Sequence, residues 1–326
     1  MVDLEVRELR YFQAVAEELN FTRAARRLGI AQPPLSKAIR QMERRLDASL
    51  FERDSHRVTL TPAGLRLLDE ARLVLDAVSA AVHRTRRAAR SALVITAKPC
   101  VATDLLRHIV SAVAALPDAP HVEVAVSGYG EQSGMVRDGR ADLALLGSPY
   151  DLRGLDSEPL LAEPRMAALP RAHPLAARAD LACRDLAGLP MPRWPSANAA
   201  ERDYWAGRDT FPGGERPTGP TVHDNSQLLE AVALGQAVAL VPASFAERYA
   251  RDDVVYRPVR DASEYTIAIA WREGLRDPWI ARVLHTAVTV AAQRATETLG
   301  TGLGEPPSRR TPENVTPPLP KGAASR

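Results

Sequence analysis

Polar side chains recur at helical spacing in the segment that begins at residue 32, and their types suit contact with nucleic acid. They are Gln32, Ser36, Lys37, Arg40 and Arg44. Glutamine can pair with the edge of adenine, while serine and lysine reach bases or phosphates. Because steps of three and four residues share one face of an α-helix, the pattern predicts a helix that enters the major groove of double-stranded DNA. A solvated basic face on an ordinary helix pair is the alternative.

The flanking residues predict two short helices with a turn between them. Asn20 or Thr22 offers a side-chain oxygen to the first helix, and Gly29 supplies the left-handed residue that ends it. Pro33 and Pro34 fit the first turn of the second helix and add an apolar tip able to touch thymine methyl groups. The expected buried stripe of this second helix is Leu35, Ile39, Met42 and Leu46.

Positive charge is concentrated in the same region. The net charge of the 326-residue chain is only +2, but basic side chains outnumber acidic ones between residues 23 and 57. A local basic footprint attracts phosphates and makes binding sensitive to salt. The charge distribution therefore favours DNA as the partner of this segment.

The N-terminal sequence resembles the LysR-type transcriptional regulators at residues 9–18, 21–40, 50–53 and 60–64. The resemblance implies a winged helix-turn-helix domain over residues 1–60. It places base and phosphate contacts at Thr22, Gln32, Pro33, Pro34, Ser36, Lys37 and Arg40. The wing would be a hairpin over residues 52–60, whose Arg53 and Arg57 enter the neighbouring minor groove or grip its backbone. Many members have glycine where this chain has Asp47, and aspartate tolerates the left-handed conformation needed there.

A long helix is predicted over residues 61–90, because Thr61 is a good N-cap and the next proline after Pro62 is Pro99. Its apolar positions alternate in steps of three and four. The predicted dimerisation seam consists of Leu68, Ala71, Leu75, Val78 and Val82. This heptad pattern favours pairing with a second copy, as a homodimer or homotetramer; packing of the stripe on the chain's own domain is the alternative.

Beyond this helix, short apolar strands alternate with helical patterns, which predicts an α/β domain. Strands are expected at residues 93–96, 122–127, 143–147, 165–169, 221–223, 238–241, 254–257 and 265–271. Helices are expected at residues 103–116, 131–138, 197–206, 226–234, 243–250 and 278–295. The pattern resembles the two-lobed, periplasmic-binding-protein-like effector domain of the LysR family. Lobe one would comprise residues 91–162 and 268–296, and lobe two residues 163–267.

The expected ligand site lies at the carboxyl ends of the strands, where helix N-termini meet in open α/β folds. The candidate effector-binding residues are Lys98, Pro99, Cys100, Val101, Thr103, Tyr129, Gly147, His223, Asn225 and Ser226. Lys98 and His223 suit a carboxylate, Thr103 and Ser226 are expected as helix caps, and Tyr129 can stack on a ring. The predicted ligand is a small molecule, either a carboxylate or an aromatic compound.

Other classes of function find less support. The chain has no metal-ligand spacing, phosphate-binding loop or nucleophile motif, so we expect no metal, no cofactor and no enzymatic activity. Its two cysteines, Cys100 and Cys183, are expected to be inert thiols, and oxidant sensing by Cys100 is the alternative. No segment predicts a membrane span or a secretory signal, which favours the cytoplasm. Residues 297–326 are expected to be disordered. A solute-binding module without DNA activity remains a competing interpretation.

Overall fold

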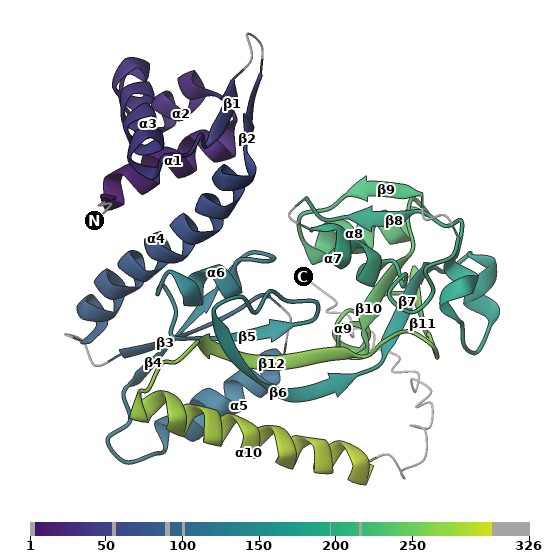
Figure 1. Cartoon of the computed structure of the whole chain (residues 1–326). Coiled ribbons are helices and arrows are strands. Elements are labelled where there is room, and N and C mark those ends of the chain that lie inside the picture. The colour runs from purple at the N-terminus through teal and green to yellow at the C-terminus, as the bar shows by residue number, and fades with distance from the viewer. Residues whose placement is uncertain are drawn as a thin grey trace, which may run out of the picture.

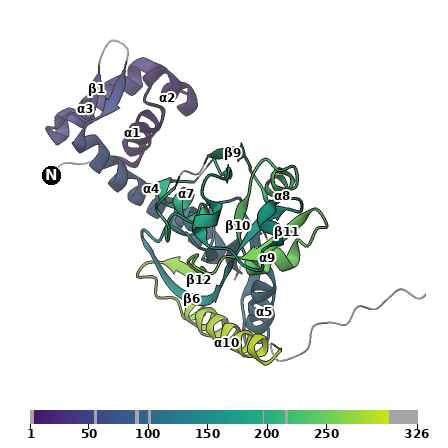
Figure 2. The ribbon, with the colours of Figure 1, turned by 90° about the vertical axis from the view of Figure 1, so that its right-hand side faces the viewer.

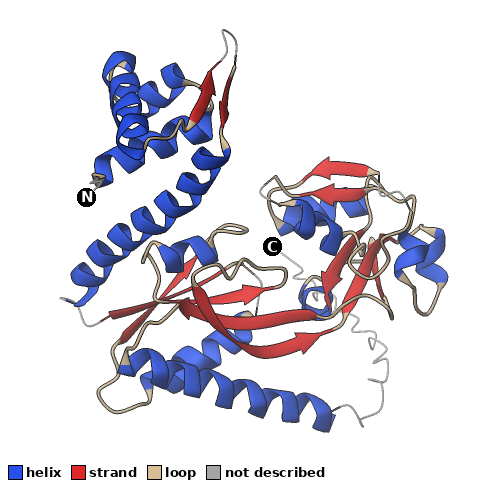
Figure 3. Cartoon of the chain, viewed as in Figure 1, coloured by secondary structure: helices blue, strands red, loops and turns tan. Residues whose placement is uncertain are grey.

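The computed structural model describes residues 4–53, 57–88, 92–99, 102–195, 197–214 and 217–301. Three parts follow one another along the chain: a small helical head, one long helix, and a larger α/β domain with two lobes (Figure 1). In a second view at right angles the head again stands apart from the α/β domain, joined to it by the long helix (Figure 2). The α/β domain contains nearly all of the strands (Figure 3).

The head consists of helices α1 (Val6–Glu18), α2 (Phe21–Leu28) and α3 (Gln32–Leu46) and a hairpin of β1 (Phe51–Arg53) and β2 (Val58–Leu60). Asn20, rather than Thr22, caps α2, since its Oδ1 accepts a hydrogen bond from the Arg23 N–H at 2.9 Å. Gly29 and Asp47 end α2 and α3 in the left-handed conformation, with φ of 68° and 48°. The predicted stripe is buried at Leu35, Ile39 and Met42 and partly buried at Leu46.

Helix α4 (Pro62–Ala88) begins after Thr61, whose Oγ1 accepts a hydrogen bond from the Gly64 N–H at 3.0 Å. Gly64 allows the helix to pass close to the head, because a Cβ there would lie 2.1 Å from the Leu50 carbonyl oxygen. At its other end, Arg87 forms an ion pair of 2.6 Å with Asp142 of the α/β domain. The helix is therefore anchored to both parts that it joins.

The packing of α4 corrects part of the predicted dimerisation seam. Leu68, Ala71 and Leu75 are buried in the head's own core, against α1, and do not face outward. The heptad pattern correctly located an apolar stripe on α4. The first part of this stripe is covered by the head of the same chain and not by a second copy. A second row, which we call the α4 stripe, remains exposed or partly exposed and consists of Leu73, Val74, Ala77, Val78, Ala81 and Val82.

Lobe one is built on a five-stranded sheet of order β4-β3-β5-β12-β6. Its strands are β3 (Ala92–Ala97), β4 (His121–Val126), β5 (Leu143–Gly147), β6 (Leu155–Glu163) and β12 (Tyr265–Arg272). The first three are parallel, and β12 runs antiparallel to both β5 and β6. Alternation in β3 buries Leu93 and Ile95 against α5 (Thr103–Ala114) and α10 (Pro278–Thr301), and Val94 against α6 (Gln132–Arg137). Helix α10 continues past residue 297, where the tail was predicted to begin; residues 302–326 lie outside the described residues.

Lobe two has an antiparallel sheet of order β10-β7-β11 and a parallel pair β8-β9. Its strands are β7 (Arg165–Pro170), β8 (Met191–Arg193), β9 (Thr218–Thr221), β10 (Ala239–Pro242) and β11 (Val254–Pro258). Its helices are α7 (Ala199–Trp205), α8 (Asn225–Ala233), α9 (Ala243–Arg248) and the short turns Pro174–Ala177 and Cys183–Leu186. The strand predicted at 221–223 ends at Thr221, and β6 and β8 were not predicted. Both contain a proline, which lowers the strand signal.

Candidate DNA interface and ligand pocket

The N-terminal half of α3 presents the predicted contact residues to solvent. Gln32, Pro33, Pro34, Lys37 and Arg40 are all exposed, and Thr22 is exposed at the start of α2. The prolines occupy the first turn of α3, as predicted. This surface combines an amide, two apolar rings and two cations on one rigid element, which is the composition that base and phosphate contacts require.

Ser36 differs from the prediction, which placed it on the exposed face of α3. It is only 7% exposed, because it adjoins the buried Leu35 at the edge of the core. Its Oγ accepts a hydrogen bond of 2.7 Å from Nε2 of Gln32. The serine hydroxyl therefore orients the glutamine amide in the unbound protein.

The hairpin beside α3 corresponds to the predicted wing, and residues 54–56 near its tip lie outside the described residues. Arg53 pairs with Glu43 at 3.0 Å and lies 4.7 Å from the ring centroid of Phe21. Glu43 also accepts a hydrogen bond from the Leu50 N–H at 3.0 Å, which ties α3 to the strand that follows. Arg53 is thus engaged at the base of the hairpin, whereas Arg57 is exposed at the start of its second strand.

A pocket lies where the two lobes meet. It is lined by Lys98, Pro99, Tyr129, Pro192, Trp194, Trp205, Asn225, Leu228, Ala239, Leu240, Val241, Pro242, Ser244, Phe245 and Tyr265. The walls are mostly apolar and aromatic, with few polar groups. Such a lining suits a small planar ligand that is oriented by one or two polar contacts.

Lys98 extends from the end of β3 into a cage of aromatic rings. Its Nζ lies 5.0 Å from the ring centroid of Tyr129, 5.7 Å from that of Trp205 and 5.6 Å from that of Tyr265. Burial lowers the pKa of Lys98 from 10.5 to about 8, and the carboxylate of Glu201 opposes this change only in part. The pocket therefore holds a cation whose charge can be removed near neutral pH.

The cage joins the lobes directly. The rings of Tyr129, which follows β4 in lobe one, and Trp194 in lobe two stack with centroids 4.7 Å apart. The Trp205 Nε1–H donates to the Tyr129 hydroxyl at 2.6 Å. Tyr129, Trp194 and Trp205 all line the pocket, so its wall includes a direct contact between the lobes.

The structure brings together some of the predicted effector residues and separates others. Lys98, Pro99, Tyr129 and Asn225 line the pocket, and Gly147 lines an adjoining cavity that it shares with Lys98 and Tyr129. Thr103, His223 and Ser226 are exposed and line neither cavity. Cys100 and Val101 lie outside the described residues.

The predicted helix caps are also corrected. Ala102 and Asp224 are the N-caps of α5 and α8, so Thr103 and Ser226 are already inside their helices. Asp224 accepts a hydrogen bond from the Gln227 N–H at 2.8 Å. Trp194, Trp205, Phe245 and Tyr265 also line the pocket but were not predicted from the sequence. Aromatic residues make up only 5% of the sequence, and this scarcity was a signal that could have drawn attention to them.

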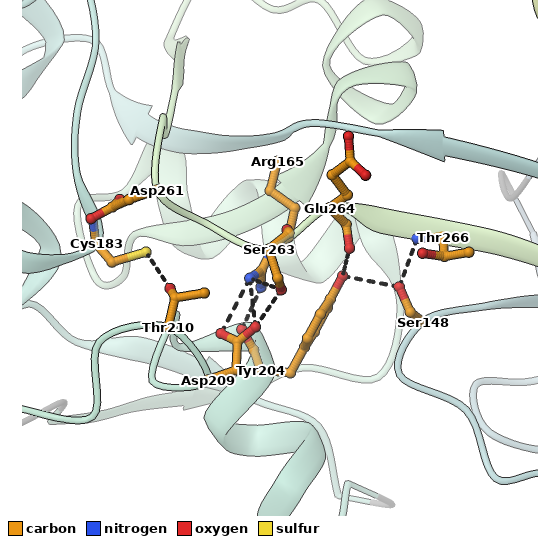
Figure 4. A network of polar contacts seen from close by, with 10 residues as sticks. All are labelled: Ser148, Arg165, Cys183, Tyr204, Asp209, Thr210, Asp261, Ser263, Glu264 and Thr266. Carbon is orange, nitrogen blue, oxygen red and sulfur yellow. Dashed lines mark hydrogen bonds and ion pairs between the residues drawn. The ribbon is translucent and has the colours of Figure 1, made fainter.

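A polar network behind the pocket fixes the end of α7 (Figure 4). Arg165 is fully buried; it pairs with Asp209 at 3.0 Å and donates to the Tyr204 carbonyl at 2.5 Å. The Tyr204 hydroxyl lies 3.0 Å from Ser148 Oγ in lobe one and donates to the Glu264 carbonyl at 3.1 Å. Because Trp205 follows Tyr204 directly, this network positions one wall of the cage.

Three further observations concern Cys183, metal ligands and membrane-spanning helices. Cys183 is buried, its Sγ lies 3.4 Å from Thr210 Oγ1, and burial raises the pKa of its thiol. Among the described residues, no group of three or more histidine, cysteine or carboxylate side chains is arranged to hold a metal ion. The same residues form no helix that is both long and apolar enough to cross a bilayer.

Known proteins resemble both parts of the chain. Residues 6–65 match the model of the bacterial regulatory helix-turn-helix protein, lysR family, and residues 86–292 match the LysR substrate binding domain. The regulator CatR of Pseudomonas putida is 30% identical over 298 residues, which cover 90% of this chain and 100% of CatR. The Hca operon transcriptional activator HcaR of Escherichia coli is 29% identical over 283 residues, or 84% and 94% of the two chains. The crystal structure of full-length BenM is 28% identical, with a TM-score of 0.52, and the match covers 90% of this chain and 98% of BenM.

Proposed function

This chain belongs to the LysR family of transcriptional regulators, and from that premise we propose which surfaces read DNA, pair with a second copy and bind the effector. Gln32 and the two prolines contact base edges, while Lys37 and Arg40 contact phosphates. Thr22 contacts the backbone from α2, and the hairpin with Arg53 and Arg57 contacts the adjacent groove. The observation that carries this assignment is the exposed, preordered amide of Gln32, which Ser36 orients at 2.7 Å.

A gel-shift titration on the upstream region of the protein's own gene tests this assignment. We expect Gln32→Ala to weaken binding to the specific site by about 1–3 kcal/mol, which is roughly 5- to 150-fold, because one paired base contact is lost. Binding to unrelated duplex DNA should stay unchanged. Gln236→Ala, an exposed glutamine of the α/β domain, is the matched control and should bind as the wild type does. Equal binding of Gln32→Ala and the wild type to the specific site would refute the assignment.

A second copy of the chain covers the α4 stripe in this proposal. Leu73, Val74 and Val82 are 50%, 43% and 45% exposed, which is unusual for three large apolar residues on one helix. Of the predicted seam, Val78 and Val82 belong to this exposed row, whereas Leu68, Ala71 and Leu75 support it from the head's core. Pairing along this helix sets the distance between two DNA-reading heads, and a homodimer or homotetramer follows.

The pocket between the lobes takes the small-molecule effector, which we propose to be a compact planar ligand, aromatic or carboxylate in character. Its stacking surface is Tyr129, Trp194 and Trp205, and its polar contacts are Lys98 and Asn225. A ligand that prefers one arrangement of the lobes shifts the population toward it and so changes how the heads are presented to DNA. This function places the protein in the cytoplasm, where the DNA is.

Tryptophan fluorescence provides the test of the pocket. All four tryptophans belong to the α/β domain, and Trp194 and Trp205 line the cavity. Saturable quenching by benzoate that is lost in Tyr129→Ala supports the assignment. Quenching that is identical in the wild type and in Tyr129→Ala would contradict it.

A further inference from the structure

The pocket cation is a lysine in a chain that otherwise uses arginine. Among the 42 lysine and arginine residues, the only lysines are Lys37, Lys98 and Lys321. A guanidinium stays protonated in proteins, whereas an ε-amine can lose its proton and then act as a nucleophile. If the pocket needed only a fixed positive charge, arginine would serve. The choice of lysine at this position points to chemistry that requires a primary amine.

The surroundings of Lys98 favour the neutral amine. No hydrogen bond or ion pair joins its Nζ to another residue in the described part of the chain, and aromatic faces surround it at 5.0–5.7 Å. The titratable groups that face it are Tyr129, Tyr265 and Glu201, and the adjoining cavity adds Arg137, Tyr150 and Asp151. Of these, Glu201 favours the ammonium, and burial outweighs it.

Tyr265 also lines the pocket. Tyr265 is 1% exposed, and within the described residues its hydroxyl has no hydrogen-bond partner. Burial also keeps its pKa well above the ordinary value, so it remains protonated. The hydroxyl is packed against Gly147, where an added Cβ would lie 1.6 Å from it, so it is the ring of Tyr265 that contributes to the pocket.

We propose that Lys98 captures a small aromatic aldehyde or ketone as a reversible imine in this pocket, an inference that rests on the proposed role of the pocket as the effector site. The unprotonated Nζ attacks the carbonyl carbon, a C–N bond forms, and one proton passes from nitrogen to the carbonyl oxygen. The resulting carbinolamine loses its hydroxyl group, and nitrogen loses a second proton, so that water leaves and a C=N bond remains. No oxidant or reductant takes part, and hydrolysis reverses the capture.

Each pocket residue has a separate role in imine formation. Lys98 supplies the nucleophile, and Tyr129, Trp194 and Phe245 hold the aromatic body of the ligand. The ring of Tyr265 forms part of the aromatic cage around the amine. Because Tyr129 and Trp194 come from different lobes, a covalently held ligand would fix the contact between the lobes for the lifetime of the imine.

Reductive trapping tests the proposal directly. The full-length protein is incubated with benzaldehyde and sodium cyanoborohydride at pH 7.5, and benzylated peptides are quantified by mass spectrometry. We expect Lys98 to be labelled at least about tenfold faster than the exposed Lys37, since more of its amine is unprotonated at this pH. The labelling rate of Lys98 should level off above pH 8–9, where its amine is fully unprotonated. Lys98→Arg, which keeps the charge, and benzyl alcohol, which lacks the carbonyl, should give no label in the pocket.

The outcomes separate this inference from the function on which it rests. Preferential labelling of Lys98 that Lys98→Arg abolishes, with unchanged circular dichroism, supports imine capture. Saturable quenching of tryptophan fluorescence by benzaldehyde without preferential labelling overturns imine capture and leaves the pocket as a non-covalent effector site. If Lys98 is not labelled and neither benzaldehyde nor benzoate quenches the fluorescence saturably, both imine capture and the proposed effector site are overturned.

Discussion

The DNA-reading head and the ligand-binding domain are assembled in different ways. In the head, most of the described side-chain hydrogen bonds are local, as in Asn20 with Arg23, Gln32 with Ser36, and Glu43 with Leu50, and the longest of them, from Arg45 to Glu8, spans 37 positions. In the α/β domain, Arg165 bonds to Ser263 across 98 positions, and the Thr266 N–H to Ser148 across 118. A surface built from local contacts tolerates substitution of single residues. The pocket instead depends on long-range contacts that must all form together.

The largest effect is expected at Arg165, where one side chain joins three distant segments. Arg165→Met leaves the partly exposed Asp209 and two carbonyl groups without the guanidinium donor and should lower the free energy of unfolding by about 2–4 kcal/mol. Urea unfolding followed by tryptophan fluorescence reports on this domain alone, because all four tryptophans lie in it. Arg153→Met is the control: its ion pair with Asp151 involves a side chain that is 77% exposed, so it should cost less than about 1 kcal/mol. If both variants lowered the free energy of unfolding equally, the buried network of Arg165 would be no more important for stability than the exposed ion pair of Arg153.

Substitution of Lys98 should raise the free energy of unfolding, whereas substitution of Arg165 lowers it. The reason is that burial of the Lys98 amine destabilises the fold. Its pKa falls from 10.5 in the unfolded chain to about 8 in the folded protein, so burial of the ammonium destabilises the fold below pH 8. Lys98→Met should therefore stabilise the domain by about 1–3 kcal/mol at pH 7. The gain should shrink as pH rises from 8 toward 10.5, where folded and unfolded chains both carry the neutral amine.

Lys37→Met in the head provides the comparison for this prediction. Lys37 is exposed, and its removal should change stability by less than about 0.5 kcal/mol at any pH. A stability gain for Lys98→Met that does not depend on pH would contradict burial of the ammonium as its cause, since altered side-chain packing or entropy would then explain it.

The α4 stripe tests whether the helix between the two regions pairs with a second copy. Val74→Glu places a charge on the exposed apolar row and should weaken self-association by at least about tenfold, since a buried unpaired charge is costly. Sedimentation equilibrium measures the change. Glu70→Gln, on the same helix but outside the stripe, should associate as the wild type does. A dimer that tolerates Val74→Glu would show that pairing uses another surface.

The smallest effect concerns salt dependence in the head. Lys37→Ala removes one phosphate contact and should reduce the slope of log affinity against log salt concentration by about one, equally for specific and unrelated DNA. Gln32→Ala should leave that slope unchanged and reduce only the preference for the specific site. A change of slope in Gln32→Ala would mean that the glutamine contacts mainly DNA phosphates. The proposed assignment of base contacts to Gln32 and phosphate contacts to Lys37 would then be wrong.

The head was largely predictable because its signals are local. The turn glycine, the two prolines at the start of α3 and the buried stripe of Leu35, Ile39 and Met42 all lie where the spacing placed them. The two errors in this region arise from tertiary packing. Ser36 is covered at the edge of the core, and the first half of the α4 seam is covered by α1. Periodicity identifies an apolar face but not the surface that covers it.

The pocket was only partly predictable. The rule that ligands lie at strand ends identified Lys98 and Tyr129 as pocket-lining residues, because Lys98 directly follows β3 and Tyr129 lies in the loop after β4. The same rule failed for His223 and Thr103, which lie on exposed segments near their helix starts. It could not find Trp194, Trp205 or Tyr265, since no local pattern distinguishes a core aromatic residue from one that lines a cavity.

The amino-acid sequence by itself determined most of the helices and strands, the exposed polar face of α3 and the family, because caps, turns and periodicities act within a few residues. Only the tertiary structure decided which aromatic rings surround Lys98, which side of α4 stays open and how Arg165 joins segments far apart in the chain. The physical reason is that burial and the lowered pKa of Lys98 depend on the summed packing of distant segments, a quantity that no short window of sequence contains.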